Sequence, residues 1–224
     1  MSGDRYSVYQ ETFMNIELAI LTFTMFIIFA TFHEYAHGWM AYRLGDSTAK
    51  RSGRLSLNPV VHIDPFMTII LPAMLLISSG GRFAIGSAKP VPVNPYLLRN
   101  PKRDVVWVGI AGPITNIAWA LFLIFLMKTS LFLPGSRIYL KGVPYLFLYI
   151  GMRINVVLLV FNMLPIPPLD GSRVVEGLLP DKYSEAYARL GRYGFIIIIL
   201  LMISGILGRL LFFVVNLIET IFAL

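Results

Sequence analysis

Long apolar runs divide this chain, and they constrain its fold more than any other feature. Residues 18–44, 105–127 and 143–163 are each long enough to cross a bilayer as a helix, which takes about 20 residues. Residues 195–224 form a fourth run, and charged residues make up only 14% of the chain, whereas about 25% is usual for soluble domains. The sequence therefore predicts a polytopic α-helical membrane protein.

We expect about four to six hydrophobic segments in one membrane-embedded domain that covers residues 1–224. Residues 66–79 are apolar but too few for a clear crossing, and Pro72 lies among them, which favours a re-entrant or short tilted helix. The run at 195–224 is interrupted by Gly205, Gly208 and Arg209. It therefore forms either one bent span or a span followed by an interfacial helix.

Basic residues set the expected orientation of these segments. They follow the first run and precede the run at 105–127, which puts both of those ends on the cytoplasmic side. The two ends agree only if the stretch between them makes no net crossing. The formal net charge of +7 is thus interpreted as a topology signal and not as a nucleic-acid surface.

The stretch after the first run contains two pieces with extended character. Residues 54–58, RLSLN, alternate between polar and apolar side chains, as a short strand does. Residues 81–101 are rich in proline and glycine around a PVPVNP core. We therefore expect a small extended or β region after the first helix.

The stretch TFHEYAHGWMA places ionisable groups inside the first apolar run. On a helix, His33 and His37 share one face, and Glu34 lies about 100° round, where it can reach a water bound to a metal held by the histidines. This is the HExxH pattern of zinc metalloproteases. Ionisable groups in the hydrocarbon cost at least a few kcal/mol without a partner or a cavity, which favours a functional site. The alternative is that the three groups act as polar contacts between helices.

A zinc ion held by two histidines needs a third protein ligand and a position for water. The chain has no cysteine, so the third ligand is a histidine or a carboxylate. The candidates are Asp170, Asp64, His62 and Asp46. Asp170 is the best placed, because it follows a proline-rich break in a membrane helix, where irregular backbone survives only beside protein or a water-filled cavity. The alternatives for Asp170 are a helix cap or a salt bridge to Arg173.

Two asparagines in apolar surroundings are candidates for a catalytic role, and two glycines are candidates for helix packing. Asn116 and Asn162 could each donate to a developing oxyanion, or each could bond a backbone carbonyl opened beside a proline. Gly109 and Gly112 favour close approach of two helices.

HEYAH, GPITN and NMLPIPPLDG follow one another on successive hydrophobic segments. This order resembles the site-2 protease family of intramembrane zinc metalloproteases, and most closely its minimal branch, which lacks PDZ and CBS domains. By that resemblance His33, His37 and Asp170 bind one zinc ion, Glu34 is the catalytic acid/base, and Asn162 helps to hold the substrate or oxyanion. The resemblance also implies a membrane-embedded sheet whose edge receives the substrate. Met67 departs from the family pattern, where glycine is expected.

The expected function is hydrolysis of peptide bonds within or near transmembrane helices of membrane-protein substrates, as in regulated intramembrane proteolysis. We expect a multi-pass protein in the lipid bilayer of the plasma membrane, with its active site toward the cytoplasmic side and no nucleic-acid partner. An unwound substrate could pair with residues 54–58 or 89–94 by strand addition. The alternative is a non-proteolytic metal-binding scaffold or a cation transporter. A transporter predicts further acidic residues along a route across the bilayer, and residues 105–127 and 143–163 contain none.

Overall fold

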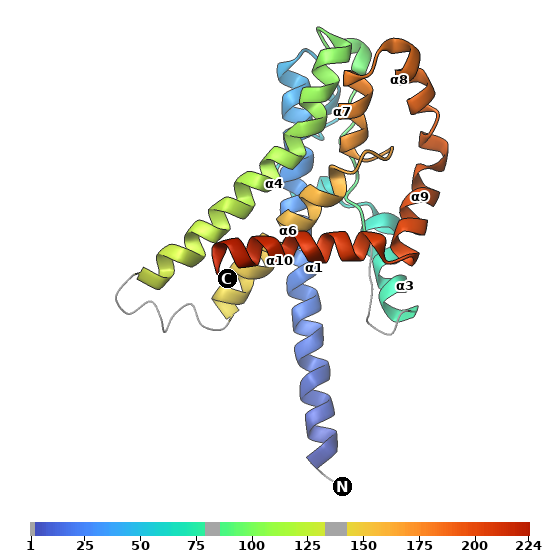
Figure 1. The fold of residues 1–224 in the computed structure, drawn as a ribbon. Helices are drawn as coiled ribbons and strands as arrows, with labels where there is room; N and C mark the ends of the chain where they lie inside the picture. The colour runs from blue at the N-terminus through green and yellow to red at the C-terminus, as the bar shows by residue number, and fades with distance from the viewer. Residues whose placement is uncertain (1–2, 79–85, 133–142) are drawn as a thin grey trace.

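The structure is a computed structural model that describes residues 3–78, 86–132 and 143–224. Residues 79–85, where the expected re-entrant segment ends and the expected extended segment begins, lie outside the described residues. The described parts consist of helices, short turns and one extended stretch (Figure 1).

Three helices are long and apolar enough to cross a membrane. They lie within α1 (Gly3–Arg43), α4 (Pro101–Phe132) and α6 (Val143–Asn162), with spans at Glu17–Arg43, Pro101–Thr129 and Pro144–Asn162. All three pack on one another around an apolar core. The predicted polytopic helical membrane protein is confirmed.

The connection from α1 to α4 returns to the end of the molecule from which it starts. It runs through α2 (Thr48–Arg51), η1 (Pro59–His62), the π-helical turn η2 (Pro65–Ile70), α3 (Leu71–Ser78) and η3 (Pro95–Leu97), listed here in chain order. The Arg99 N–H then donates to the Leu44 carbonyl oxygen over 3.0 Å, which joins the end of α1 to the start of α4. The end of α1 and the start of α4 thus lie at the same end of the molecule, as a stretch without a net crossing requires, and α3 lies far from that end (Figure 1).

The extended region expected after the first helix is present at residues 86–94, but it is not part of a sheet. No residue in the described parts forms a β-strand, so the strand predicted at residues 54–58 is wrong. The reason is the lack of a partner strand: Ser87 and Lys89 donate their N–H groups to carbonyls of Met67 and His62 in helical turns. Two prolines, at positions 90 and 92, also have no N–H to donate.

The C-terminal run is divided into two helices. After α7 (Asp170–Leu178) and α8 (Asp181–Ala188), α9 (Gly191–Ile203) is followed by Gly205, whose φ of +72° lets the chain turn sharply into α10 (Ile206–Phe222). Figure 1 shows α10 lying crosswise to α1. Of the two alternatives for residues 195–224, two separate segments is therefore the one observed.

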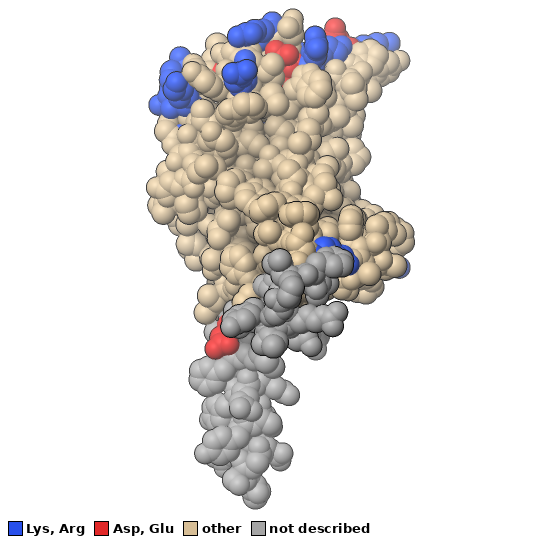
Figure 2. Space-filling view, turned by 90° about the vertical axis from the view of Figure 1, so that its left-hand side faces the viewer, with Lys and Arg blue, Asp and Glu red and all other residues tan. Residues whose placement is uncertain are grey.

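Polar contacts hold α10 against α6 and the end of α4. The Tyr149 hydroxyl donates to Glu219 over 2.6 Å, and Arg153 lies 3.6 Å from the same carboxylate. Lys128 donates to the carbonyl oxygen of Ala223 at the C-terminal end of α10. At the opposite end of the molecule, where α7 and α8 lie, Lys and Arg side chains gather (Figure 2). The charge is therefore distributed as in a membrane protein with one basic end.

Candidate metal centre

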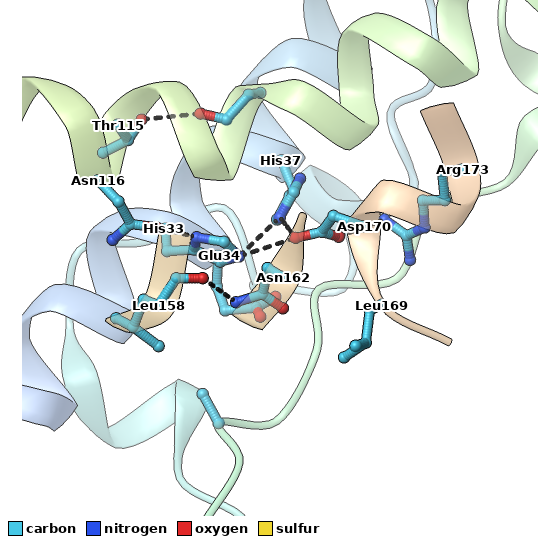
Figure 3. A network of polar contacts seen from close by, with 12 residues as sticks. His33, Glu34, His37, Thr115, Asn116, Leu158, Asn162, Leu169, Asp170 and Arg173 are labelled. Atoms are coloured by element: carbon cyan, nitrogen blue, oxygen red, sulfur yellow. Dashed lines mark hydrogen bonds and ion pairs between the residues drawn. The ribbon is translucent and has the colours of Figure 1, made fainter. Parts of the chain in front are cut away.

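Three buried side chains meet where α1, α4 and α7 pack together. His33 and His37 come from one face of α1, and Asp170 is the first residue of α7 (Figure 3). Each histidine Nε2 lies 3.1 Å from Asp170 Oδ2, and the two Nε2 atoms are 3.0 Å apart. The three side chains thus present their ligand atoms at the corners of a nearly equilateral triangle.

The triangle fits a zinc ion. In tetrahedral zinc sites the bonds to histidine and carboxylate are about 2.0–2.1 Å long, so neighbouring ligand atoms lie about 3.3–3.4 Å apart. The separations of 3.0–3.1 Å are close to that value. Two imidazoles and one carboxylate are also a usual donor set for catalytic zinc, which leaves a fourth position open. Among the described residues, this is the one group of His, Asp and Glu side chains with such geometry.

The His33 ring is oriented by a relay of two fully buried asparagines. The Asn155 amide nitrogen lies 2.8 Å from the Gly151 carbonyl oxygen, which can only accept, so the Asn155 side-chain oxygen faces Asn116. Asn116 therefore donates to it over 2.9 Å and turns its own oxygen to His33 Nδ1, 2.6 Å away. The relay requires a proton on His33 Nδ1 and leaves the Nε2 lone pair for a metal.

The His37 ring is oriented by backbone instead. Its Nδ1 donates to the Val108 carbonyl oxygen of α4 over 2.7 Å. This bond has the same effect as the asparagine relay, because it fixes the proton on Nδ1 and frees Nε2. Both rings are thus set in the tautomer that binds a metal.

Asp170 is held by the turn that precedes it and by its position at a helix start. The Arg173 guanidinium lies 3.7 Å from Asp170 Oδ1, so the expected ion pair is present beside the triangle and favours the ionised carboxyl. The first turn of α7 also favours a negative charge. The side chain is therefore in the carboxylate form that a metal needs.

The proline-rich turn before Asp170 is clamped by α8 and α9. The Tyr187 hydroxyl of α8 donates to the Pro165 carbonyl oxygen over 2.9 Å. Gly194 of α9 packs directly on Pro167, so closely that a Cβ at Gly194 would overlap the Pro167 carbonyl oxygen. The third ligand is thus positioned by the C-terminal part of the chain.

Two glycines allow α4 to approach the centre. A Cβ at Gly112 would collide with His37 Nε2 and would lie 2.5 Å from His33 Cε1. A Cβ at Gly109 would lie 3.2 Å from the Asp170 carbonyl oxygen. The expectation that both glycines permit close helix approach is confirmed, and Gly112 keeps the space beside the ligand atoms open.

Glu34 lies next to the triangle but is not one of its corners. One of its carboxylate oxygens, Oε2, accepts a hydrogen bond of 2.8 Å from the Val91 N–H in the extended segment. Asn162, at the end of α6, donates its amide to the Leu158 carbonyl oxygen one turn earlier, over 2.9 Å. Figure 3 shows both side chains near the histidines.

The sequence did not reveal every residue of this network. Asn116 was a candidate oxyanion donor, but both ends of its amide are engaged with His33 and Asn155. Asn155 was overlooked; its signal was an amide in the middle of an otherwise apolar run. The sequence thus predicted the metal ligands but not the hydrogen bonds that orient them.

The other three candidates for the third ligand have structural roles in the α1–α4 connection. Asp64 accepts from two backbone N–H groups at the start of η2. His62 Nε2 lies 2.8 Å from the Ser56 carbonyl oxygen, and Asp46 accepts from the Asn94 N–H. None of the three joins the triangle.

The fold and the site define a helical membrane protein with a His-His-Asp centre suited to zinc. Residues 136–203 match the profile of Peptidase family M50. The chain is 37% identical over 204 residues to "Putative zinc metalloprotease YwhC" of Bacillus subtilis. The aligned region covers 90% of this chain and 86% of that relative. The chain therefore belongs to peptidase family M50, the site-2 protease family of zinc metalloproteases, and its cofactor is zinc.

Two further relatives carry the same description. "Putative zinc metalloprotease Rip2" of Mycobacterium tuberculosis is 31% identical over 183 residues, 82% of this chain and 66% of the relative. "Putative zinc metalloprotease MJ0611" of Methanocaldococcus jannaschii is 44% identical over 69 residues, 31% of this chain and 32% of the relative. No solved structure matches the chain.

Proposed function

We propose that the protein is an intramembrane zinc metalloprotease that hydrolyses peptide bonds within or near transmembrane helices of its substrates. The observation that carries the proposal is the buried triangle of His33, His37 and Asp170, which is built on a membrane-spanning helix. These three residues would hold the zinc ion. In a soluble protease the metal ligands would not lie on a membrane-spanning helix.

The proposed chemistry divides between the metal and the side chains around it. A zinc ion held by these residues would act as a Lewis acid, polarising the scissile carbonyl and lowering the pKa of the water bound to it. Glu34 takes the proton of the attacking water and returns it to the leaving amine, as a general base and then a general acid. Asn162 holds the substrate or the developing oxyanion. His33 and His37 keep their Nδ1 protons throughout, because their acceptors are fixed.

The proposed location follows from depth and charge. Arg43, at the basic end of α1, lies roughly 15 Å along the helix from His33. Because basic residues favour the cytoplasmic side, we place the site inside a plasma membrane, nearer its cytoplasmic face. The substrate is a transmembrane helix that unwinds before cleavage, since helical carbonyls are engaged in internal hydrogen bonds.

The extended segment at residues 86–94 has few free backbone N–H groups with which an unwound substrate could pair. Pro90 and Pro92 have no N–H, and the N–H of Val91 is already bonded to Glu34. Strand addition along residues 89–94 would therefore use mainly carbonyl oxygens of the segment, because Val93 alone keeps an N–H without an acceptor among the described residues.

The test compares zinc content and cleavage in three forms of the purified protein. Zinc per chain is measured by mass spectrometry in detergent, and cleavage is measured on a single transmembrane helix with a central Gly-Pro pair between two soluble tags. The native chain and Glu34→Gln should each hold about one zinc, whereas Asp170→Ala should hold far less. Only the native chain should cleave.

Two results would overturn the proposal. If all three forms lack metal under chelator-free handling, the centre is not a zinc site. If Glu34→Gln cleaves as fast as the native chain, Glu34 is not the acid/base. Zinc binding without cleavage of any transmembrane helix would favour the metal-binding scaffold instead.

A further inference from the structure

The extended segment at residues 86–94 touches the candidate catalytic centre through one atom of its backbone. The Val91 N–H donates to Glu34 Oε2, across 57 positions of sequence. Val91 is 4% exposed and Glu34 is half-buried, so this bond is partly shielded from solvent. A buried charge-assisted hydrogen bond is shorter and stronger than a neutral one.

The segment is fixed on both sides of Val91. The Lys89 N–H donates to the His62 carbonyl oxygen over 2.8 Å, and the Asn94 N–H donates to Asp46 over 2.6 Å. Arg54 donates to the Lys89 carbonyl oxygen over 2.7 Å. Three anchors from the stretch that follows α1, at Asp46, Arg54 and His62, leave Val91 little freedom to move.

Packing on α1 adds a further constraint. Gly38 lies one turn after Glu34, and a Cβ placed on it would come within 2.9 Å of a methyl carbon of Val91. The segment thus lies directly on the helix that carries Glu34, at a distance that only glycine permits. The Val91 N–H is held at a fixed position relative to the carboxylate.

Two prolines make this N–H the only donor available at that point. Pro90 and Pro92 flank Val91, and neither has an N–H. Their rings also restrict the backbone to extended conformations. The Pro-Val-Pro triplet at residues 90–92 therefore presents a single N–H, that of Val91, to a single acceptor.

We propose that residues 86–94 form a positioning arm whose Val91 N–H orients the carboxylate of Glu34 for general-base catalysis. The bond holds Oε2 and prevents rotation of the carboxylate, so that Oε1 remains directed to accept the proton of the attacking water. Val91 is a positioning residue that acts through Glu34. The inference rests on the role of Glu34 in the proposed function.

The first test measures the contact itself and does not depend on proteolysis. The full-length protein is labelled with ¹⁵N-valine in detergent, and the Val91 amide signal is identified by its loss in Val91→Ala. Exchange of this N–H with deuterium should be at least about tenfold faster in Glu34→Ala than in the native chain. It should stay slow in Glu34→Gln, because the amide oxygen of glutamine still accepts. Equal exchange rates in all three forms would overturn the contact.

The second test measures the positioning role. Valine 91 is replaced by its α-hydroxy acid, which changes the amide to an ester and removes only the N–H. The matched control is the same replacement at Val93, for which no described group accepts its N–H. We expect kcat for the Gly-Pro helix substrate to fall about tenfold to a hundredfold at position 91, with KM and zinc content unchanged. The ester at position 93 should behave as the native chain does.

The outcomes separate this inference from the proposed function. If the native chain cleaves and Glu34→Gln does not, but the ester at position 91 keeps the native kcat, the arm has no positioning role. If both esters lower kcat equally, or zinc content falls with kcat, the segment is merely structural and the inference is wrong. A native chain that cleaves nothing overturns the proposed function, and the exchange rates still decide whether the contact exists.

Discussion

The half of the helix bundle that carries the metal centre packs through glycines and polar bonds to the ligands, whereas the other half packs mainly through large apolar side chains. Near the centre, α4 presents Gly109, Gly112 and Asn116 to its neighbours. Further along the same helix, Leu123 and Met127 pack in the apolar core. One helix thus serves two kinds of contact along its length.

The difference determines what each half tolerates. Apolar cores accept changes that preserve volume, because dispersion contacts have little directional preference. The metal centre depends on where single atoms lie, because a ligand and its hydrogen-bond partner must meet at fixed distances. Substitutions in the two halves should therefore fail in different ways.

The largest effect should come from Gly112→Ala. The added methyl group would collide with His37 Nε2 and press on the His33 ring, so zinc content should fall from about one per chain to nearly none. Mass spectrometry measures the metal, and circular dichroism checks that the helices remain. The matched control is Gly208→Ala in α10, where a Cβ meets no atom within 4 Å. Full zinc binding by Gly112→Ala would show that the histidines can move aside.

The apolar half should respond with a loss of stability and not of metal. Leu123 is 5% exposed, and Leu123→Ala should lower the free energy of unfolding by about 2–4 kcal/mol through the cavity that it leaves. Zinc content should be unchanged below the unfolding temperature. Leu121→Ala is the control on the same helix, because Leu121 is 51% exposed. A loss of zinc in folded Leu123→Ala would remove the distinction between the two halves.

The two histidines allow a finer comparison within the centre. Asn116→Ala removes the acceptor of His33 Nδ1, and zinc affinity should fall about tenfold to a hundredfold in competition with a chelator. Val108→Ala changes the side chain but keeps the carbonyl oxygen that supports His37, so its affinity should stay near the native value. Equal losses in the two variants would mean that packing, not the hydrogen bond, sets the ring position.

The smallest effect should come from the far end of the bundle. Tyr149→Phe removes the hydroxyl that donates to Glu219 and should cost about 1 kcal/mol of stability, measured by thermal unfolding in detergent. Tyr145→Phe is the control, because the Tyr145 hydroxyl has no partner among the described residues. If both variants unfold at the same temperature as the native chain, the bond from Tyr149 to Glu219 adds no stability to the packing of α10.

Side-chain patterns were enough to predict the spans, the re-entrant connection and the residues that meet at the centre. Apolar runs report membrane crossing directly, and the helical spacing of His33 and His37 places both on one face. Asn155 was not predicted, because which face of α6 points at α4 depends on helix packing. The Val91 N–H was not predicted either, because every residue except proline has a backbone N–H and the sequence does not single out one of them. The alternation of polar and apolar side chains at residues 54–58 led to a wrong strand prediction, because a strand also needs a neighbouring strand to pair with.

The ligands of the centre are widely separated along the chain, and this separation has a consequence for how the protein is made. Asp170 follows His33 by 137 positions, and α4, which supports both histidines, lies between them. Chains are synthesised from the N-terminus, so the histidines enter the membrane long before their third partner exists. A half-made chain cannot assemble a competent centre. The metal centre therefore forms only after Asp170, and with it most of the chain, has been made.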